Sequence, residues 1–202
     1  EHAMADLTSV AKLLSETLQP YEAVRRNAEA QLLQMSHSPG FGIQLVRLAV
    51  EAQTSPEIRL AAAVNLKNFV KKNWNKESCE IEISDSDRVT LRNDVLPCMY
   101  ATSGSVRKQM SEIVCTIGKY DFPVAWPEMI RDLVAHLDMK EMDKLIATLT
   151  AMEELFKRYR YESKSLELWQ EIKFVLDNAA APITELFTKM LQQIPRVDMM
   201  SE

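Results

Sequence analysis

Five side chains between positions 60 and 71 combine apolar and basic groups at helical spacing. Leu60, Val64, Lys67, Asn68 and Lys71 recur at intervals of three and four residues, which places them along one side of an α-helix. Charged groups around an apolar contact are the usual composition of a protein–protein interface. We interpret this face as half of a protein-binding surface. The alternative is that Leu60 and Val64 pack on a neighbouring helix while the lysines extend past it into water.

The segment that carries these side chains is predicted to be an α-helix. Residues 58–74, IRLAAAVNLKNFVKKNW, contain no glycine or proline and include three consecutive alanines, a composition that favours helix. On the opposite side, Ile58, Ala62, Leu66 and Phe69 form an apolar stripe that must face a core. The mixed face is therefore predicted to lie on the outside of a helix that is buried along its other side. Both lysines are predicted to face solvent.

The composition of the chain favours an all-α protein. Its 202 residues are 47% hydrophobic but include only four glycines and eight prolines, and the turns of a sheet protein would use more glycine. No apolar run approaches the roughly 18 residues that cross a membrane, and the start, EHAMADLT, has no apolar signal region. We expect residues 1–3 to be a leftover of expression cloning, with the native start at Met4.

Cysteine and histidine give no sign of a metal site or of catalysis. Cys79, Cys98 and Cys115 match no metal or disulfide spacing and indicate a reducing compartment, while the isolated His37 and His136 suit surface or packing roles. The sequence has no phosphate-binding glycine loop and no nucleophile elbow, and no acid, base and nucleophile stand at a productive spacing. We therefore expect a protein that is not an enzyme and that needs no cofactor or metal.

Helices recur in pairs along the chain. First members are predicted to begin near positions 7, 41, 87, 127 and 166 and second members near 21, 56, 105 and 142, so that successive pairs begin 34 to 46 residues apart. This period is typical of HEAT repeats. The sequence therefore predicts an all-α fold, an α-α superhelix or HEAT-repeat solenoid of about four and a half helix pairs, which forms a single domain over residues 4–202.

Three breaks are predicted within this pattern. Gly118 is predicted to end the helix that begins near 105, residues 75–86 are predicted to form a loop, and Pro182 is predicted to kink or split the last helix, which fades after Ile194. The fifth pair is incomplete, and no polar repeat closes the array. We expect a fragment of a longer solenoid, and the alternative is a short natural chain that ends by oligomerising.

Two segments resemble the importin-β (karyopherin) family. RLAAAVNLKNFVKKNW, residues 59–74, resembles the signature of that family's second repeat, and DFPVAWPEMI, residues 121–130, resembles its connector between the third and fourth repeats. A third segment, FKRYRYESKSLELWQEIKFVLD at 156–177, is narrower and resembles the exportins that return importin-α to the cytoplasm. The likeness runs from Met4 to Ile194. It implies a HEAT-repeat transport receptor that shuttles between the nucleus and the cytoplasm.

The resemblance also implies a binding site. In this family the N-terminal repeats bind the GTP form of the small GTPase Ran on the concave side, through the second helix of each pair. Lys67 and Asn68 match the family's LKN motif, and Lys71 follows one turn later. The residues assigned to a Ran-GTP site are Leu60, Val64, Lys67, Asn68, Lys71, Arg25, Arg26, Glu154 and Arg158. Importin-α is implied as a second partner, which would need repeats beyond residue 202.

Alternatives stay open for the weaker members of this set and for the function. Outside the lysine-bearing helix no motif supports the assignments, and a solvated face with an ion pair between Glu154 and Arg158 is the alternative there. The chain could instead be an import-type karyopherin or a passive HEAT scaffold. A nucleic-acid module is a further alternative, against which the net charge of −5 argues. Its basic residues would be Lys67, Lys71, Lys72 and Arg158. No membrane partner is expected.

Overall fold

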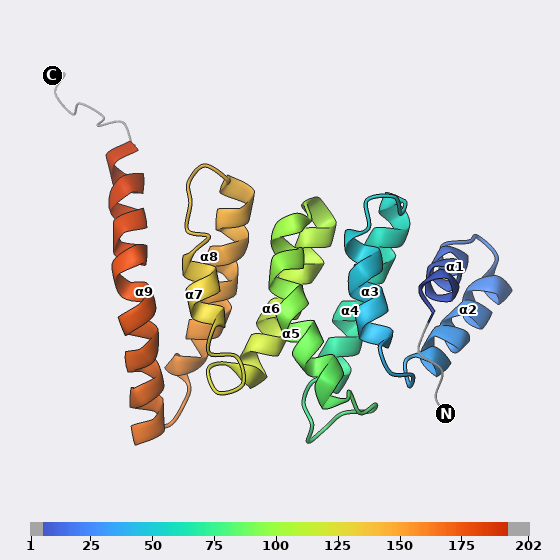
Figure 1. The fold of residues 1–202 in the computed structure, drawn as a ribbon, viewed down its shortest axis with the longest axis horizontal. Coiled ribbons are helices and arrows are strands. Elements are labelled where there is room, and N and C mark those ends of the chain that lie inside the picture. Colours follow the sequence, from blue (N-terminus) through green and yellow to red (C-terminus); the bar gives the residue numbers. More distant parts are fainter. Residues whose placement is uncertain (1–5, 194–202) are drawn as a thin grey trace, which may run out of the picture. The chain divides into compact units, whose positions relative to one another are not determined.

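The computed structural model describes residues 6–193, which form α-helices, one short 3-10 helix and connecting loops. In chain order (Figure 1) the elements are α1 (Leu7–Thr17), α2 (Glu22–Met35), α3 (Phe41–Val50), α4 (Pro56–Asn73), α5 (Asp85–Ala101), α6 (Gly104–Asp121), α7 (Met129–Val134), α8 (Met142–Lys157), η1 (Arg158–Arg160) and α9 (Leu166–Gln193). These residues contain no strand, which confirms the all-α fold class. The expectations for residues 1–3, for Met4 and for the helix end after Ile194 lie outside the described residues.

The chain divides into two compact units, of which the first ends at Phe122 and the second begins at Pro123. In the first unit the helices form three pairs, α1 with α2, α3 with α4 and α5 with α6. Because α3 also packs against α5 and α4 against α6, the first helices of these two pairs make one layer and their second helices another, while α1 packs against both α3 and α4. This stacking of helix pairs is the HEAT arrangement that the sequence period predicts. The single domain over 4–202 stays a prediction, and each unit is described by itself.

Local sequence signals fix the start of α4. Ser55 is the N-cap, and its hydroxyl oxygen accepts a hydrogen bond from the Ile58 amide at 3.4 Å. Pro56 takes the first helical position, where its missing N–H has no consequence. Farther along, Ala62 and Leu66 are fully buried. The predicted inner stripe of this helix therefore faces the core of the first unit.

Three helices approach one another closely around Gly42 on α3. A Cβ atom at this position would lie 3.2 Å from a ring carbon of Phe69 on α4 and 3.2 Å from a methyl carbon of Leu91 on α5. The Phe69 ring also makes an edge contact with Phe41, with ring centroids 5.4 Å apart. Gly42 therefore allows α3 to pack tightly against both of its neighbours.

Helix α6 continues through Gly118 and ends at Asp121, so the prediction that Gly118 ends this helix is wrong. The Gly118 carbonyl accepts a hydrogen bond from the Phe122 amide at 3.0 Å. The carboxylate of Asp121 accepts a second one from the indole nitrogen of Trp74 at 2.9 Å. These contacts stabilise the last turn of α6, and they outweigh the low helix propensity of a single glycine.

In the second unit, α7 packs against both α8 and α9. Met129, Ile130 and Leu133 of α7 are fully buried. Helix α9 is continuous through Pro182 (Figure 1), so the predicted split is wrong. Its inner side is buried before and after the proline, at Leu168, Val175, Ala179 and Leu186. This packing holds both halves of the helix in line, and its stabilisation is larger than the cost of the backbone hydrogen bond that a proline removes.

The outer side of α9 exposes large apolar side chains. Each of the following is at least half exposed: Leu166, Trp169, Leu176, Phe187 and Leu191. We call these five residues the outer stripe of α9. Trp169 and Leu191 bracket a run of six helical turns, and the members recur at helical spacing along it. The stripe therefore follows the length of the helix on one side.

No helix within residues 6–193 is both long and apolar enough to span a bilayer. The same residues hold no group of three or more His, Cys, Asp and Glu side chains that could bind a metal ion. Within the described residues, Cys79, Cys98 and Cys115 form no disulfide. Burial raises the pKa of the Cys98 thiol to about 11.

Candidate protein-binding surface

The mixed face predicted from the sequence lies on the side of α4 that points away from the core of the first unit. Leu60, Val64 and Lys67 are half-buried, whereas Asn68 and Lys71 are exposed. We call these five residues the outer arc of α4. Its apolar members are partly covered and its polar members are accessible, as in a protein-binding surface. Because partial cover also fits packing on a neighbouring helix, the assignment of this arc to a binding site stays a prediction.

Lys67 differs from the sequence prediction, because it does not extend freely into solvent. Its ammonium nitrogen lies 3.8 Å from a carboxylate oxygen of Glu112 on α6, and the side chains are 23% and 50% exposed. The stacking of α4 on α6 brings this acid to the lysine. Lys71, one turn farther along, is exposed as predicted. Before a partner binds, Lys67 is therefore already paired with an acid, whereas Lys71 is exposed to solvent.

A groove of about 660 Å³ lies beside the outer arc, between α2, α4 and the loop of residues 75–84. Its apolar walls are formed by Leu32, Leu33, Phe41, Phe69 and Ile81. Its polar lining includes Glu29, Asn65, Asn68, Lys71, Lys72 and Glu80. Asn68 and Lys71 thus belong both to the outer arc and to the groove. A concave apolar site with a few polar groups at its rim is suited to receive a side chain or short segment of another protein.

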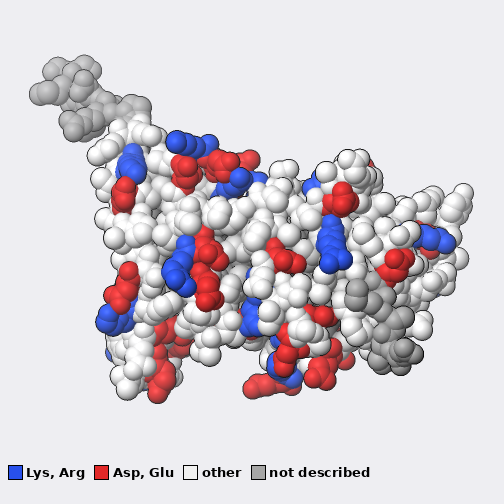
Figure 2. Space-filling model, in the orientation of Figure 1, with Lys and Arg blue, Asp and Glu red and all other residues white. Residues whose placement is uncertain are grey.

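The charges around this groove are mixed in sign. The ammonium of Lys72 lies 3.5 Å from a carboxylate oxygen of Glu80, and both side chains are largely exposed. On the face of the molecule that Figure 2 shows, acidic and basic side chains are likewise interspersed. A nucleic-acid site would instead gather basic groups along one surface. The groove and the visible face therefore favour a protein partner.

The two arginines assigned from the first repeat have other contacts. The guanidinium of Arg25 donates to the carbonyl oxygens of Gln19 at 3.0 Å and Pro20 at 2.8 Å, which holds the turn between α1 and α2. Arg26 forms an ion pair with Glu22 one turn earlier on α2 at 2.5 Å, and both side chains are exposed. Arg25 is thus engaged in local structure, and Arg26 is accessible.

Of the two residues assigned from the fourth repeat, Arg158 is engaged within the second unit, whereas Glu154 is exposed. In place of the ion pair that the alternative joined between Glu154 and Arg158, Glu154 pairs with Lys157 at 2.8 Å and Arg158 pairs with Glu171 on α9. The Arg158 guanidinium also lies 5.2 Å from the ring centre of Tyr159, whose hydroxyl donates to Glu171 at 2.6 Å. Arg158 thus links η1 to α9.

Sequence reasoning missed three residues beside the predicted site. Glu112 could not be assigned, because its pairing with Lys67 depends on how α4 stacks on α6. Leu33 is 62% exposed and lines the groove. Helical spacing could have placed it outside, because the buried residues of α2, Ala28 and Leu32, lie on another side of the helix. Ile81 comes from the loop of residues 75–84, where two isoleucines, Ile81 and Ile83, were too few to establish a period.

Two family models match the chain. The importin-beta N-terminal domain matches residues 28–101, and the family described as Cse1 matches residues 155–201. Exportin-2 of Oreochromis niloticus is 36% identical over 189 residues, which cover 93% of this chain and 19% of the relative. Exportin-2 of Drosophila melanogaster is 37% identical over 191 residues, again 93% of this chain, and 20% of the relative. The chain therefore spans about a fifth of the length of these curated relatives.

Solved structures share the fold. The exportin Cse1 in its cargo-free, cytoplasmic state is similar with a TM-score of 0.81 and 30% identity, covering 94% of this chain and 20% of that one. A structure of Kap95p with RanGDP is similar with a TM-score of 0.63 and 17% identity, covering 94% and 25%. At 17% identity the second likeness concerns the fold alone.

Proposed function

Because the chain belongs to the importin-β family, we propose that it is part of a nuclear transport receptor and binds Ran-GTP through the outer arc of α4. The family membership predicted from residues 59–74 and 121–130 is confirmed by the match of the importin-beta N-terminal domain and by the exportin-2 relatives. Those relatives are transport receptors of the exportin class. The observation that carries the proposal is the outer arc, on which exposed polar groups flank partly covered apolar ones.

The chemistry of the outer arc suits a rigid acidic partner. Lys71 can meet a carboxylate directly, since it is exposed. Lys67 must exchange Glu112 for the partner's carboxylate or share it between them, and its ion pair of 3.8 Å is long enough to be displaced readily. Asn68 can donate and accept hydrogen bonds beside them. Leu60 and Val64 would lose their remaining water in the same contact.

Recognition of the nucleotide state needs no nucleotide site in this chain. The switch segments of a small GTPase are ordered by the γ-phosphate and released after hydrolysis. A surface complementary to the ordered segments therefore distinguishes GTP from GDP indirectly. The sequence of this chain has no phosphate-binding glycine loop, which accords with this mode. The Kap95p structure supports it by analogy, because Kap95p binding induces the switch loops of RanGDP to adopt the GTP-bound conformation.

The remaining parts of the proposal concern the longer protein. The exportin-2 relatives are about five times as long as the region they share with this chain. We infer that the longer receptor carries importin-α as cargo and shuttles between nucleus and cytoplasm, with importin-α held partly by repeats beyond residue 202. The Cse1 match over residues 155–201 supports the exportin class over an import-type karyopherin.

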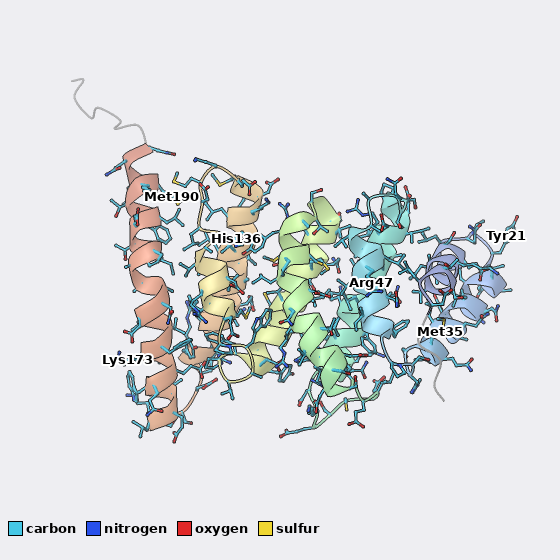
Figure 3. All side chains as sticks on the ribbon, viewed as in Figure 1. Tyr21, Met35, Arg47, His136, Lys173 and Met190 are labelled. Atoms are coloured by element: carbon cyan, nitrogen blue, oxygen red, sulfur yellow. The ribbon has the colours of Figure 1, made fainter. Side chains whose placement is uncertain are left out.

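Direct binding of the chain to Ran tests the proposal. Ran loaded with a non-hydrolysable GTP analogue should bind, and Ran loaded with GDP should bind at least about tenfold more weakly. Lys71→Glu should weaken the GTP complex. Arg47→Glu is the matched control, because Arg47 is an exposed cation on α3, in the layer of first helices (Figure 3). Equal affinity for the GTP and GDP forms of Ran would contradict the proposal. Equal losses of affinity in Lys71→Glu and Arg47→Glu would show that the outer arc is not the binding site.

Salt dependence separates the proposal from its alternatives. A nucleic-acid module would bind short duplexes or single strands, with an affinity that falls steeply and linearly with the logarithm of salt concentration. A passive HEAT scaffold would bind other proteins but would not distinguish the two forms of Ran. Titrations of the chain with both forms of Ran, and with a short duplex and a single strand at two salt concentrations, therefore decide between these three functions.

A further inference from the structure

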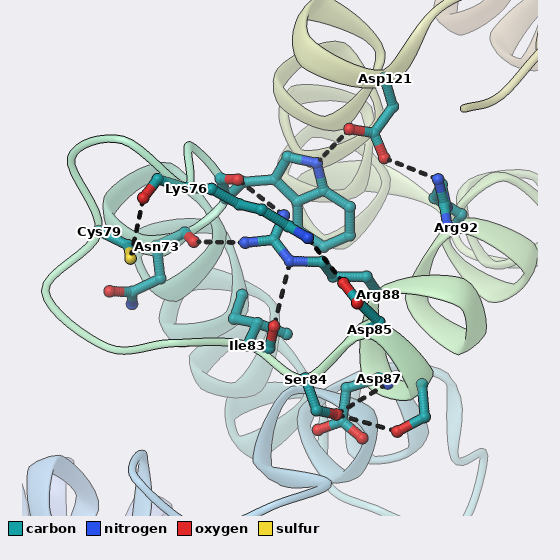
Figure 4. A network of polar contacts seen from close by, with 12 residues as sticks. Asn73, Lys76, Cys79, Ile83, Ser84, Asp85, Asp87, Arg88, Arg92 and Asp121 are labelled. Carbon is teal, nitrogen blue, oxygen red and sulfur yellow. Dashed lines mark hydrogen bonds and ion pairs between the residues drawn. The ribbon is translucent and has the colours of Figure 1, made fainter. Parts of the chain in front are cut away.

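A buried arginine joins three segments at the end of α4 (Figure 4). Arg88, on the first turn of α5, is only 6% exposed. Its guanidinium donates to three backbone carbonyl oxygens, those of Trp74 at 2.7 Å, Asn73 at 3.1 Å and Ile83 at 3.1 Å. The last carbonyls of a helix have no partner within the helix. Arg88 therefore caps the end of α4 and also fixes the residue that precedes the N-cap of α5.

The same cluster reaches the end of α6. The Trp74 ring lies under the guanidinium, with its centre 4.8 Å from the Arg88 Cζ atom. Its indole nitrogen donates to one carboxylate oxygen of Asp121 at 2.9 Å, and the other oxygen accepts from Arg92 at 3.2 Å. Burial lowers the pKa of the Arg88 guanidinium below its ordinary value. The fixed fork of an arginine suits a site with three acceptors in different directions.

Asn73 connects this cluster to the groove. Asn73 is buried, and its side-chain oxygen accepts a hydrogen bond from the Ile81 amide at 2.8 Å while its amide group donates to the Phe69 carbonyl at 2.9 Å. Asn73, Glu80 and Ile81 all line the groove. The backbone of Asn73 is held by Arg88, and its side chain holds Ile81. The loop of residues 75–84 thus forms one end of the groove, and its position depends on Arg88, which does not itself line the groove.

We propose that Arg88 is a positioning residue for the groove between α2 and α4. It holds the end of α4 and the loop of residues 75–84 in place, so that Lys71 and Ile81 meet a partner as one preformed wall. This inference rests on the proposed function, because its final readout is the binding of Ran-GTP. Preformed order matters for affinity, since each side chain ordered on binding weakens a complex by roughly a factor of 2 to 10.

Hydrogen exchange on the unmodified chain is the first test. The Ile81 amide lies in a loop, but its bond to Asn73 should protect it about as well as the amides in the last turns of α4. Arg88→Met keeps an apolar stem and removes all five donors, so it should raise exchange at Ile81 by at least about tenfold. Free exchange of Ile81 in the unmodified chain would overturn the inference without any variant.

A thiol in the loop supplies a second test. Cys79 is half-buried, and its sulfur lies 3.7 Å from the Lys76 carbonyl oxygen. In a Cys98→Ser/Cys115→Ser background, alkylation by iodoacetamide reports on this loop alone. Arg88→Met should speed the reaction of Cys79, and Arg88→Lys, which retains three donors on one nitrogen, should fall between. An unchanged rate in Arg88→Met would contradict the proposed link between Arg88 and the loop.

Binding then separates positioning from general stability. Arg88→Met should weaken binding to Ran-GTP by about tenfold, and Arg88→Lys should recover part of this loss. Val95→Ala removes two methyl groups from the core on α5, where Val95 is fully buried, and serves as the control for lost stability. It should leave the affinity within about twofold. Equal affinity of Arg88→Met and the unmodified chain, or an equal loss in Val95→Ala, would refute the positioning role.

The outcomes for the two proposals remain distinguishable. If the unmodified chain does not bind Ran-GTP, the proposed function fails, while the exchange of Ile81 and the reaction of Cys79 still decide whether Arg88 holds the loop. If Arg88→Met does not fold, Arg88→Lys and the unmodified chain supply the same comparison. If the chain binds Ran-GTP although the Ile81 amide exchanges freely, the proposed function stands and the positioning role of Arg88 is wrong.

Discussion

The basic residues of α4 and those at the end of α8 look alike in sequence, but their surroundings differ. On α4, Lys71 is exposed and Lys67 makes only a long ion pair to Glu112. At the end of α8, Arg158 lies against Tyr159 and pairs with Glu171, with both charged side chains about four-fifths covered. A cation on a second helix therefore indicates a binding surface only where its own unit does not already supply a well-placed acid.

The chemistry of the two cations explains part of this difference. The planar guanidinium of Arg158 can stack on an aromatic ring and approach a carboxylate with two nitrogens. The ammonium of Lys67 is a strongly hydrated point charge on a flexible stem, and it gains little from a half-exposed carboxylate. The pair in the second unit therefore contributes to stability, and the pair in the first unit leaves charge available to a partner.

The largest effect is expected from reversing both lysines of α4. Lys67→Glu/Lys71→Glu should weaken binding to Ran-GTP by about 2 to 5 kcal/mol if the lysines meet buried acids, and by far less if they lie at the rim. Glu154→Lys, the corresponding reversal in the second unit, should leave the affinity unchanged. Calorimetric titration measures both. A loss in Glu154→Lys as large as in the double variant would erase the distinction between the two regions.

A smaller effect is expected from removing the acid that holds Arg158. Glu171→Leu leaves the guanidinium and the Tyr159 hydroxyl without their acceptor, so it should lower the free energy of unfolding by about 1 to 3 kcal/mol. Urea denaturation followed by circular dichroism measures this. The control is Lys173→Gln, which breaks an exposed pair with Asp177 on the same helix. Equal stabilities of the two variants would mean that Arg158 is no better anchored than a surface cation.

The third prediction concerns the stability of the first unit. Lys67→Glu places a second carboxylate beside Glu112 and should lower the free energy of unfolding by about 0.5 to 1 kcal/mol. This corrects the sequence expectation that both lysines simply face solvent. Adding Glu112→Lys should restore the loss, because the pair is then reversed. If the double variant is as unstable as the single one, the contact between α4 and α6 is not electrostatic.

The smallest effect is expected at Arg26. Its pair with Glu22 is exposed and lies within one helix, so Arg26→Ala should change the free energy of unfolding by about 0.2 to 0.5 kcal/mol. The change should shrink further in high salt, where exposed pairs are screened. Its effect on Ran-GTP affinity sharpens the comparison, since Arg26 is accessible whereas Arg25 holds a turn. A loss in affinity above about tenfold would extend the binding surface to α2.

Local patterns sufficed for the helices and for the composition of the outer arc. Ser55 and Pro56 mark the start of α4 because capping is a property of neighbouring residues. Gly118 and Pro182 gave wrong predictions of a helix end and a helix split for the opposite reason, since each is a local signal that tertiary packing overrides. Propensity amounts to about 1 kcal/mol for glycine, and the contacts of Trp74 with Asp121 can exceed that.

The polar links between helices were beyond the reach of the sequence. Arg88 lies on the apolar side of α5 by periodicity, but no pattern tells which carbonyls it will meet. The pairing of Lys67 with Glu112 depends on the register of two stacked helices, 45 residues apart in the chain. Such contacts follow from the assembled fold, and the family resemblance could supply the expected partner of the site but not these contacts.

The outer stripe of α9 has a practical consequence at the bench. Dyes such as ANS brighten when they bind exposed apolar surface, and their signal is commonly taken as a sign of a loosened core. Here the fully folded chain already offers Trp169, Leu176 and Phe187 to such a dye. The folded chain should also be retained on a hydrophobic column at moderate ammonium sulfate, because that salt strengthens apolar association. Loss of structure in any variant is therefore better judged from tyrosine and tryptophan near-UV dichroism than from dye fluorescence.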